Sequence, residues 1–415
     1  MQLAVYASIM LVAAPASEPT DGGSRTEIGV LPAINYNSDL GLGVGVLAAV
    51  AQLSPGSEPY DWRVQLLLYA TLRDQGSGIE LPYHSDYIQL DIPGFLDPKL
   101  RLNTEVAFRK LSNAAYHGFG SRSEASTSEA LPARYYQYDR IYPSLSANFR
   151  IQLFDEEVSK GKRRLEMFAG TRLTYNLFDL YEGSLLETDI ARLEAETDGG
   201  ALGDSLYGYE DHFLWVLNLG LLWDTRDHEI IPARGTFSEL SVRASPGVDA
   251  DLAFVGLTLA SSWFIGLYED IVVLALRGVG DVQIGHVPFT EQTLFGALNP
   301  TSGPGGGMAV RGVPLQRFTG KIKVIANLEV RARLLPFELF EQKINLGLAA
   351  FADTGRVWAD FDAPDGLDGD LGDFSVGLGG GLRAQWGETF VIRADYAVSP
   401  TEDTSGLYID VGQVF

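Results

Sequence analysis

Residues 321–334 read KIKVIANLEVRARL, and this stretch decides the fold because its apolar side chains recur at every second position. Successive side chains of a β-strand point to opposite faces, so the alternation predicts a strand with one apolar and one polar face. Residues 343–358 read KINLGLAAFADTGRVW and alternate in the same way. Glu329 on the first segment and Asp353 on the second belong to the polar faces. We therefore expect both carboxylates on the same side of one sheet.

The same period of two recurs along the whole chain and predicts about sixteen strands, most of them about 10–14 residues long. The expected strand cores are residues 26–36, 41–53, 60–73, 79–92, 99–111, 134–153, 163–181, 212–226, 235–245, 251–266, 271–287, 320–335, 343–357, 373–385, 389–398 and 405–415. An even number of strands of this length is typical of a transmembrane barrel, whereas a soluble β-sandwich would use shorter strands. The predicted fold is all-β, a 16-stranded antiparallel transmembrane β-barrel with a long loop folded into its lumen.

Composition narrows the class of protein. The chain has 415 residues, no cysteine and a formal net charge of -23, which argues against nucleic acid as a partner. No change in composition divides the chain, so one large architecture is expected. Without cysteine, neither a disulfide framework nor a thiolate metal site is available.

The N-terminal stretch is interpreted as an export signal. Residues 1–16 have an apolar core and end in Ala14-Pro15-Ala16, which resembles a signal-peptidase site. A disordered segment or a first strand is the alternative. The expected organisation is a signal peptide over residues 1–16, a short periplasmic segment over 17–25 and an outer-membrane barrel over 26–415.

Connection lengths predict the orientation of the barrel. Long connections, such as those after residues 111, 181 and 287, alternate with short turns such as PGFLDP and HEIIPARG. Outer-membrane barrels place long loops outside and short turns in the periplasm, so both ends of the barrel segment are expected on the periplasmic side. The last predicted strand ends in Phe415, which resembles the C-terminal signal of such barrels. An edge strand that happens to end in Phe is the alternative.

A glycine-rich segment stands out among the long connections. Residues 303–314 read GPGGGMAVRGVP and carry one cation, Arg311. If this loop folds back into the barrel, the Arg311 guanidinium would offer a planar fork to Glu329 and Asp353. The cluster would then hold the loop in place, or it would also take part in gating.

Four motifs carry a family resemblance. They are Val310-Arg311-Gly312 in the late loop, the FADTG motif from Phe351 to Gly355, the DTRDHEIIPARG motif from Asp224 to Gly235, and Phe415; within the third motif, Asp224, Arg226, Asp227 and Gly235 match the pattern. Together they resemble the barrel of the BamA/TamA superfamily, the bacterial surface antigen type. The resemblance implies that the loop before the twelfth strand enters the lumen, where Arg311 and Gly312 meet Glu329 and Asp353.

The sequence departs from this family pattern at two points. Val313 follows the Val-Arg-Gly motif where the family usually has Phe or Tyr. Family members that assemble or translocate proteins carry periplasmic POTRA domains, and here only a short segment precedes the first expected strand, so the barrel is expected to lack them. The resemblance also implies a weakly paired seam between the first and last strands, expected near residues 27–36 and 407–415.

The function implied by the resemblance is assistance in inserting or translocating proteins at the bacterial outer membrane. Expected partners are outer-membrane lipid and lipopolysaccharide, and either outer-membrane protein clients or a separate periplasmic protein. A passive or gated pore without assembly activity is the alternative, because sixteen strands can enclose a channel.

We expect neither catalysis nor a bound cofactor. The chain has no G-x-S-x-G and no Walker loop, and its five histidines are scattered. No metal site is expected either: the acidic stretch 361–373 does not match a calcium-binding spacing and is interpreted as a solvated loop.

Overall fold

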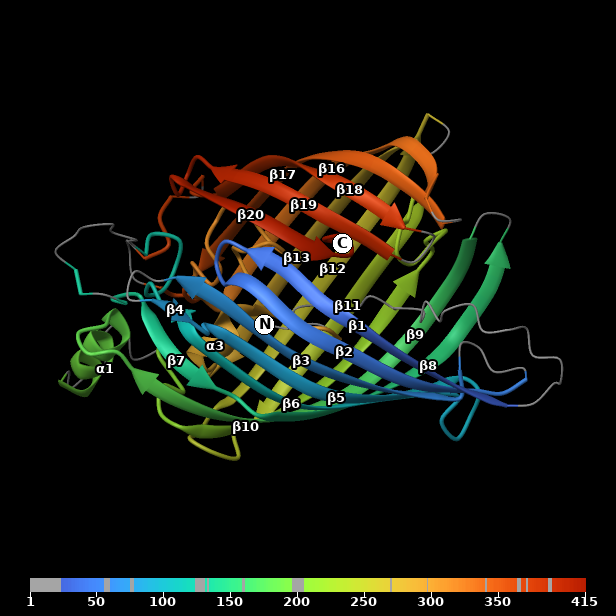
Figure 1. Ribbon diagram of the computed structural model, residues 1–415. Helices are drawn as coiled ribbons and strands as arrows, with labels where there is room; N and C mark the ends of the chain where they lie inside the picture. The colour runs from blue at the N-terminus through green and yellow to red at the C-terminus, as the bar shows by residue number, and fades with distance from the viewer. Residues whose placement is uncertain are drawn as a thin grey trace.

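The alternating segments form a closed antiparallel barrel with sixteen wall strands (Figure 1), as the sequence predicts. The computed structural model describes residues 24–55, 60–74, 78–123, 131–132, 134–158, 161–195, 205–268, 271–296, 298–339, 342–363, 367–370, 372–386 and 390–415. The expected signal peptide therefore lies outside the described residues.

Each wall strand pairs with its neighbours in chain order, and two wall strands are each made of two consecutive pieces, β4 with β5 and β7 with β8. The strands are β1 (Arg25–Asn37), β2 (Gly41–Leu53), β3 (Trp62–Asp74), β4 (Ile79–Glu80), β5 (Tyr83–Pro93), β6 (Leu100–Ala115), β7 (Gln137–Ile141), β8 (Ser144–Val158), β9 (Gly161–Leu180), β10 (His212–Asp224), β11 (Gly235–Pro246), β12 (Ala253–Leu267), β13 (Val272–Gly285), β16 (Ile322–Leu339), β17 (Gln342–Trp358), β18 (Ser375–Trp386), β19 (Phe390–Ser399) and β20 (Thr404–Val411).

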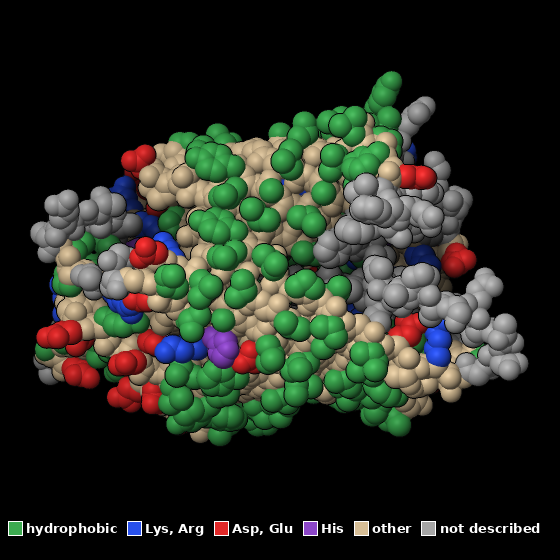
Figure 2. All heavy atoms as spheres, viewed as in Figure 1, with side chains coloured by type: hydrophobic (Ala, Val, Ile, Leu, Met, Phe, Trp, Pro, Cys, Tyr) green, Lys and Arg blue, Asp and Glu red, His purple; other side chains and the backbone are tan. Residues whose placement is uncertain are grey.

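Side chains alternate between the lipid-facing surface and the lumen. On β12, Val255, Leu257 and Leu259 are about half exposed, whereas the alternate residues Phe254 and Thr258 are buried inside the barrel. Figure 2 shows the same separation, with hydrophobic side chains covering the wall and charged side chains gathered toward the two ends. An apolar outer band with a polar interior is the arrangement that lets a barrel sit in a bilayer.

Three expected strands differ from the structure. The expected strand 79–92 is broken between β4 and β5, and the expected strand 134–153 is broken between β7 and β8, where Pro143 has no N–H to donate to a ladder. The expected last strand, 405–415, ends at Val411 instead. Gly412 then adopts a positive φ of 92°, and this turns the chain away from the sheet.

The two ends of the barrel differ in their connections. The loop end, at the left in Figure 1, carries the long connections and the helix α1 (Leu185–Ala195). At the start of this helix the Glu187 amide donates to the Ser184 hydroxyl, and the Glu187 carboxylate accepts from the Gly183 amide. The opposite end, called the turn end below, carries the short connections. Among the described residues, no helix is both long and apolar enough to span a membrane.

Candidate functional site

The connection between β13 and β16 folds into the lumen and is called the lumen loop (residues 286–321). It contains the short helix α3 (Phe289–Gln292) and a small hairpin of β14 (Leu294–Phe295) and β15 (Thr301–Ser302). Most of the described residues of this loop are buried, among them Phe289 and Arg311. The predicted insertion of this loop is therefore confirmed.

All three guanidinium nitrogens of Arg311 donate hydrogen bonds to carboxylates on the barrel wall. Its Nε and Nη2 donate to the two carboxylate oxygens of Asp353, at 2.7 and 3.0 Å, and its backbone amide donates to the same carboxylate at 3.1 Å. Its Nη1 donates to Glu329 at 2.6 Å and to Asp395 on β19 at 3.1 Å. The guanidinium carbon lies 3.4 Å from the centroid of the Phe351 ring. The structure thus brings together Arg311, Glu329 and Asp353, and adds Asp395, which the sequence analysis did not include.

Further cations surround the three carboxylates. Arg331 donates to Glu329 at 2.7 Å, and Arg383 and Arg393 both pair with Asp395. Although burial by itself lowers the pKa of the Arg311 guanidinium, its hydrogen bonds to Asp353 and the nearby carboxylate charges raise that pKa above its ordinary value. Arg311 therefore stays charged inside the barrel, where an unpaired charge would be costly.

Glycines of the wall and of the loop allow the close packing around Arg311. A Cβ on Gly377 of β18 would lie 1.9 Å from the Arg311 carbonyl oxygen, and one on Gly379 would lie 2.5 Å from the Phe351 ring. Gly312 has a φ of 90°, and its Cβ would lie 2.9 Å from the Val398 backbone. Only glycine allows this approach and this backbone conformation together.

The valines on either side of Arg311 and Gly312 pack in a hydrophobic core. Val310 and Val313 are both fully buried in one cluster with Phe318, so Val313 fills space in the core of the loop. A Cβ on Gly355 would lie 2.9 Å from the Val310 side chain, which explains the need for glycine in the FADTG motif.

A second set of ion pairs holds the entry of the lumen loop. Asp281 on β13 accepts hydrogen bonds from Arg243 at 2.6 and 3.0 Å and from the Gly296 amide of the loop at 3.1 Å, and Lys323 lies 3.0 Å from it. Glu291 of α3 pairs with Arg172 on β9 at 2.7 Å. This second anchor was not predicted from the sequence, although charged side chains recur at inward positions of β9, β11, β13 and β16.

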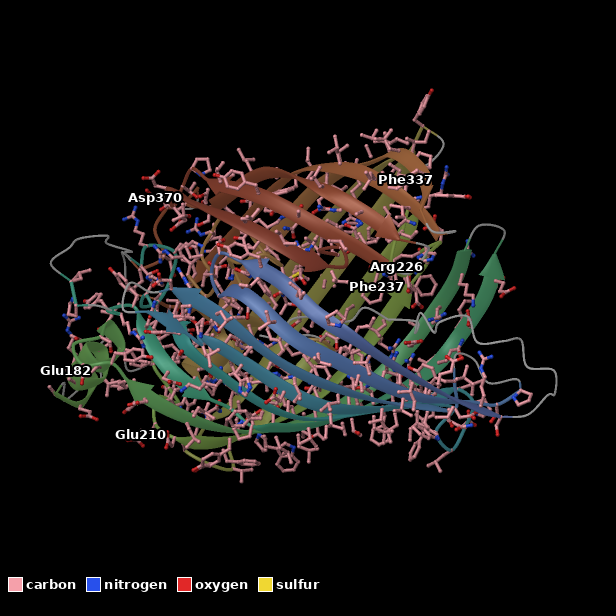
Figure 3. All side chains as sticks on the ribbon, in the orientation of Figure 1. Glu182, Glu210, Arg226, Phe237, Phe337 and Asp370 are labelled. Carbon is pink, nitrogen blue, oxygen red and sulfur yellow. The ribbon has the colours of Figure 1, made fainter. Side chains whose placement is uncertain are left out.

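The DTRDHEIIPARG motif forms the turn between β10 and β11. Asp224 binds the Arg226 guanidinium at 2.9 and 2.8 Å, and the Asp227 carboxylate accepts the amides of Ala233 and Arg234. Arg226 lies over the Phe237 ring, 4.5 Å from its centroid, at the turn end of the barrel (Figure 3).

Gly235 ends this turn with a φ of 99°. Across the mouth of the barrel, the Ile231 carbonyl accepts from Arg333 of β16 at 3.1 Å. The motif is therefore a folded turn that partly covers the turn end.

Phe415 lies inside the barrel, which corrects its expected place in a closing strand. After Gly412 the chain enters the turn end, where the Val414 carbonyl accepts from Arg277 and the Phe415 carbonyl accepts from Arg331. The Phe415 ring packs in a cluster with Ala233 and Phe264. Two motifs distant in sequence, the β10–β11 turn and Phe415, thus meet at the turn end.

The junction between β1 and β20, called the seam below, is short. Only Tyr36 with Ile409 and Asn37 with Tyr408 are paired there, whereas all residues of β1 pair with β2. A hydrogen bond from the Ser38 amide to the Leu407 carbonyl, at 3.1 Å, extends the contact by one step. On its outer edge, β1 has no strand partner from Arg25 to Asn35 in the described part of the chain.

The lumen loop also contacts the strand that forms the seam. The Gly312 amide donates to the Tyr408 hydroxyl at 3.1 Å, and the Thr404 hydroxyl donates to the Gly312 carbonyl at 2.7 Å. The glycine after Arg311 therefore connects the loop directly to β20. Among the described residues, no group of three or more His, Cys, Asp and Glu is arranged to hold a metal ion.

Comparison with known proteins gives a family and a shared fold. The sequence-family model of the Omp85 superfamily domain matches residues 88–415 of this chain. Among solved structures, the chain is similar to BamA from Haemophilus ducreyi lacking POTRA domains 1-3, with 15% identity and a TM-score of 0.57, over 96% of this chain and 74% of that one.

It is also similar to CdiB from Escherichia coli, with 12% identity and a TM-score of 0.57, over 93% of this chain and 62% of that one. CdiB from Acinetobacter baumannii gives 13% identity and a TM-score of 0.52, over 94% of this chain and 65% of that one. The chain thus spans less than two thirds of either CdiB chain. A comparison with curated protein sequences gives no match.

Proposed function

Because this chain belongs to the Omp85 superfamily, whose domain covers residues 88–415, we propose that it assists the insertion or translocation of proteins at the bacterial outer membrane. The observation that carries the proposal is the short seam. Two residue pairs close the barrel there, so separating β1 from β20 breaks far fewer backbone hydrogen bonds than separating any other neighbouring wall strands.

An open seam would present a template for an incoming strand. The outer edge of β1 carries backbone N–H and C=O groups over Arg25–Asn35 that a client strand can pair with. Pro32 lies within this stretch and has no N–H, so pairing along the edge would be interrupted at one donor. A strand of a client barrel has the extended backbone that such pairing needs.

The position of the lumen loop supports an assembly role over a passive pore. A wide aqueous pore needs an unobstructed lumen, whereas here Val310, Arg311 and Val313 are fully buried inside the barrel. Small, irregular currents that increase when residues 300–314 are deleted would agree with this view. Large, steady currents from the intact protein would favour the pore.

The proposed orientation follows the connections. The loop end with α1 faces the exterior and meets lipopolysaccharide, and the turn end faces the periplasm, where a protein client or a separate periplasmic partner would arrive. The apolar wall contacts membrane lipid.

A reversible cross-link tests the role of the seam. The chain has no cysteine, so pairs can be introduced cleanly. Tyr36→Cys with Ile409→Cys joins two register partners across the seam. The matched control is Ile34→Cys with Val44→Cys, which joins partners within the fully paired β1–β2 hairpin.

The assay measures how fast a urea-unfolded eight-stranded outer-membrane barrel folds into liposomes that contain this protein. We expect faster folding than in empty liposomes, loss of that gain when the seam pair is oxidised, and recovery on reduction. The control cross-link should leave the rate unchanged. Full activity with a closed seam would refute opening at this junction, and equal rates with and without the protein would refute insertion itself.

A further inference from the structure

A polar cavity lies between the lumen loop and the opposite wall of the barrel. Three arginines from three strands line it, Arg109 on β6, Arg140 on β7 and Arg172 on β9, and Leu294 and Leu298 of the lumen loop form its other side. The cavity volume is about 70 Å³. Since a water molecule needs roughly 10–15 Å³ on this measure, the space holds several waters or one small ion.

The three arginines differ in how their charge is balanced. Arg109 pairs with Glu105 at 2.7 Å, and Arg172 pairs with Glu291 at 2.7 Å. Arg140 has no carboxylate within ion-pair distance among the described residues. Its Nε and Nη2 both donate to the single amide oxygen of Asn176, at 3.0 and 2.6 Å.

Arg140 nevertheless remains a buried cation. The residue is 8% exposed, and its guanidinium lies over the Tyr142 ring, 4.4 Å from the centroid. Its Nη1 has no hydrogen-bond partner in the part of the chain that the structure describes. A guanidinium stays charged in proteins, so this buried site has one positive charge more than its carboxylates balance.

The surroundings of Arg140 are suited to a small oxoanion. A guanidinium binds the oxygens of phosphate or sulfate through parallel N–H donors, and a buried charge gains most from such a partner. Ser144 and Thr174, which are register partners beside Tyr142, also line the cavity, and their hydroxyls can donate to further oxygens of the anion.

We propose that this cavity binds one small inorganic oxoanion, such as phosphate, at the Arg140 guanidinium. The bound anion balances the charge of Arg140 and fills the space between the lumen loop and the wall strands β6 to β9. This inference does not depend on the proposed role in protein insertion, because it concerns a site away from the seam.

Thermal unfolding of the purified, folded barrel in detergent tests the proposal with phosphate as the probe. Phosphate is varied while a bulky organic anion, too large for the cavity, keeps the ionic strength constant. A ligand that binds only the folded state raises its stability with saturation, so we expect a saturable rise in melting temperature on the order of 2–4 °C. No phosphate-specific rise in the unaltered protein overturns the proposal.

Substitutions then locate the site. Arg140→Gln should abolish the rise, and Arg140→Lys, which keeps the charge but not the planar fork, should need about tenfold more phosphate for half the effect. The control is Arg122→Gln, because Arg122 is half exposed and pairs with Asp370 outside the cavity. A full phosphate response in Arg140→Gln would overturn the proposal. If that variant does not fold, an unchanged phosphate requirement in Arg140→Lys would do so.

Discussion

The wall formed by β16 and β17 and the seam formed by β1 and β20 are both antiparallel strand pairs, but they are held very differently. β16 pairs with β17 from Ile322 to Leu339, and Arg311 of the lumen loop binds carboxylates on both strands. The seam has two residue pairs near Tyr36. One barrel therefore contains a wall reinforced from inside and a junction that is nearly open.

The difference has a local cause in the last strand. β20 is eight residues long and ends at Val411, and the chain turns into the lumen at Gly412, so β20 cannot follow β1 along its length. The residues after this turn contribute instead to the interior, because Arg277 and Arg331 bind their carbonyl groups. The last residues of the chain thus contact Arg277 of β13 and Arg331 of β16 inside the barrel instead of pairing with β1.

The largest expected effect comes from removing the cation that reinforces the wall. Arg311→Ala leaves Glu329, Asp353 and Asp395 buried with one cation fewer, and breaking such a pair costs about 3–5 kcal/mol. Urea unfolding of the folded barrel in detergent measures this loss. Arg122→Ala serves as the control, since its exposed ion pair should change stability by about 1 kcal/mol or less. Equal stability of the two variants would contradict the role of Arg311 as the main contact of the loop.

Close packing of the loop against β18 gives the next effect. Gly377→Ala places a methyl group 1.9 Å from the Arg311 carbonyl oxygen, which must move, and overpacking of this kind costs about 1–3 kcal/mol. Gly278→Ala on β13 is the matched control, because a Cβ at Gly278 meets nothing within 4 Å. The same unfolding measurement should separate the two alanine variants. An equal effect of both would show that the loop does not rest on β18.

A smaller and pH-dependent effect is expected beside the seam. Asp39 lies in the turn between β1 and β2; burial raises its pKa from 3.8 to about 6, against the opposing effects of a Leu315 amide hydrogen bond and Arg73. The folded protein then holds a proton that the unfolded chain releases. This contribution is present below about pH 4 and lost as the pH rises through about 6.

Asp39→Asn should remove that dependence and stabilise the protein at pH 7 by about 1–2 kcal/mol. Unfolding curves of the unaltered protein and of Asp39→Asn, recorded at several pH values from about 4 to about 8, measure the difference. Parallel pH profiles would mean that the Asp39 carboxyl is charged in the fold.

The smallest expected effect concerns the contact between the loop and β20. Tyr408→Phe removes the hydroxyl that accepts from the Gly312 amide and should cost about 1 kcal/mol, because a buried donor loses its partner. The same variant should speed amide exchange in β20 more than in β16. Slower or unchanged amide exchange in β20 would show that the contact between the lumen loop and β20 does not help to close the seam.

Much of this architecture could be predicted from sequence because its signals are local. The period of two in residues 321–334 gave the faces of β16, and the same rule placed Glu329 and Asp353 on the lumen side, where Arg311 meets them. The family resemblance of the four motifs is confirmed by the Omp85 match.

The remaining features depend on contacts between distant segments. Asp395 was not among the predicted site residues, because its pairing with Arg311 depends on how the barrel closes around the loop. Phe415 continued an alternating pattern, yet the positive φ of Gly412 turned the chain inward. Arg140 lies on the short strand β7, which the alternation merged with β8, so its cavity could not be predicted.

Hydrogen–deuterium exchange of the barrel in lipid nanodiscs tests most directly whether the seam is the weak junction of a reinforced barrel. We predict that amides of β1 between Thr26 and Asn35 whose N–H points away from β2, together with amides of β20 whose N–H points away from β19, exchange much faster than amides of β16 and β17. Protection of these amides equal to that of β16 would contradict it, because such protection requires a strand partner that the two-pair seam does not provide.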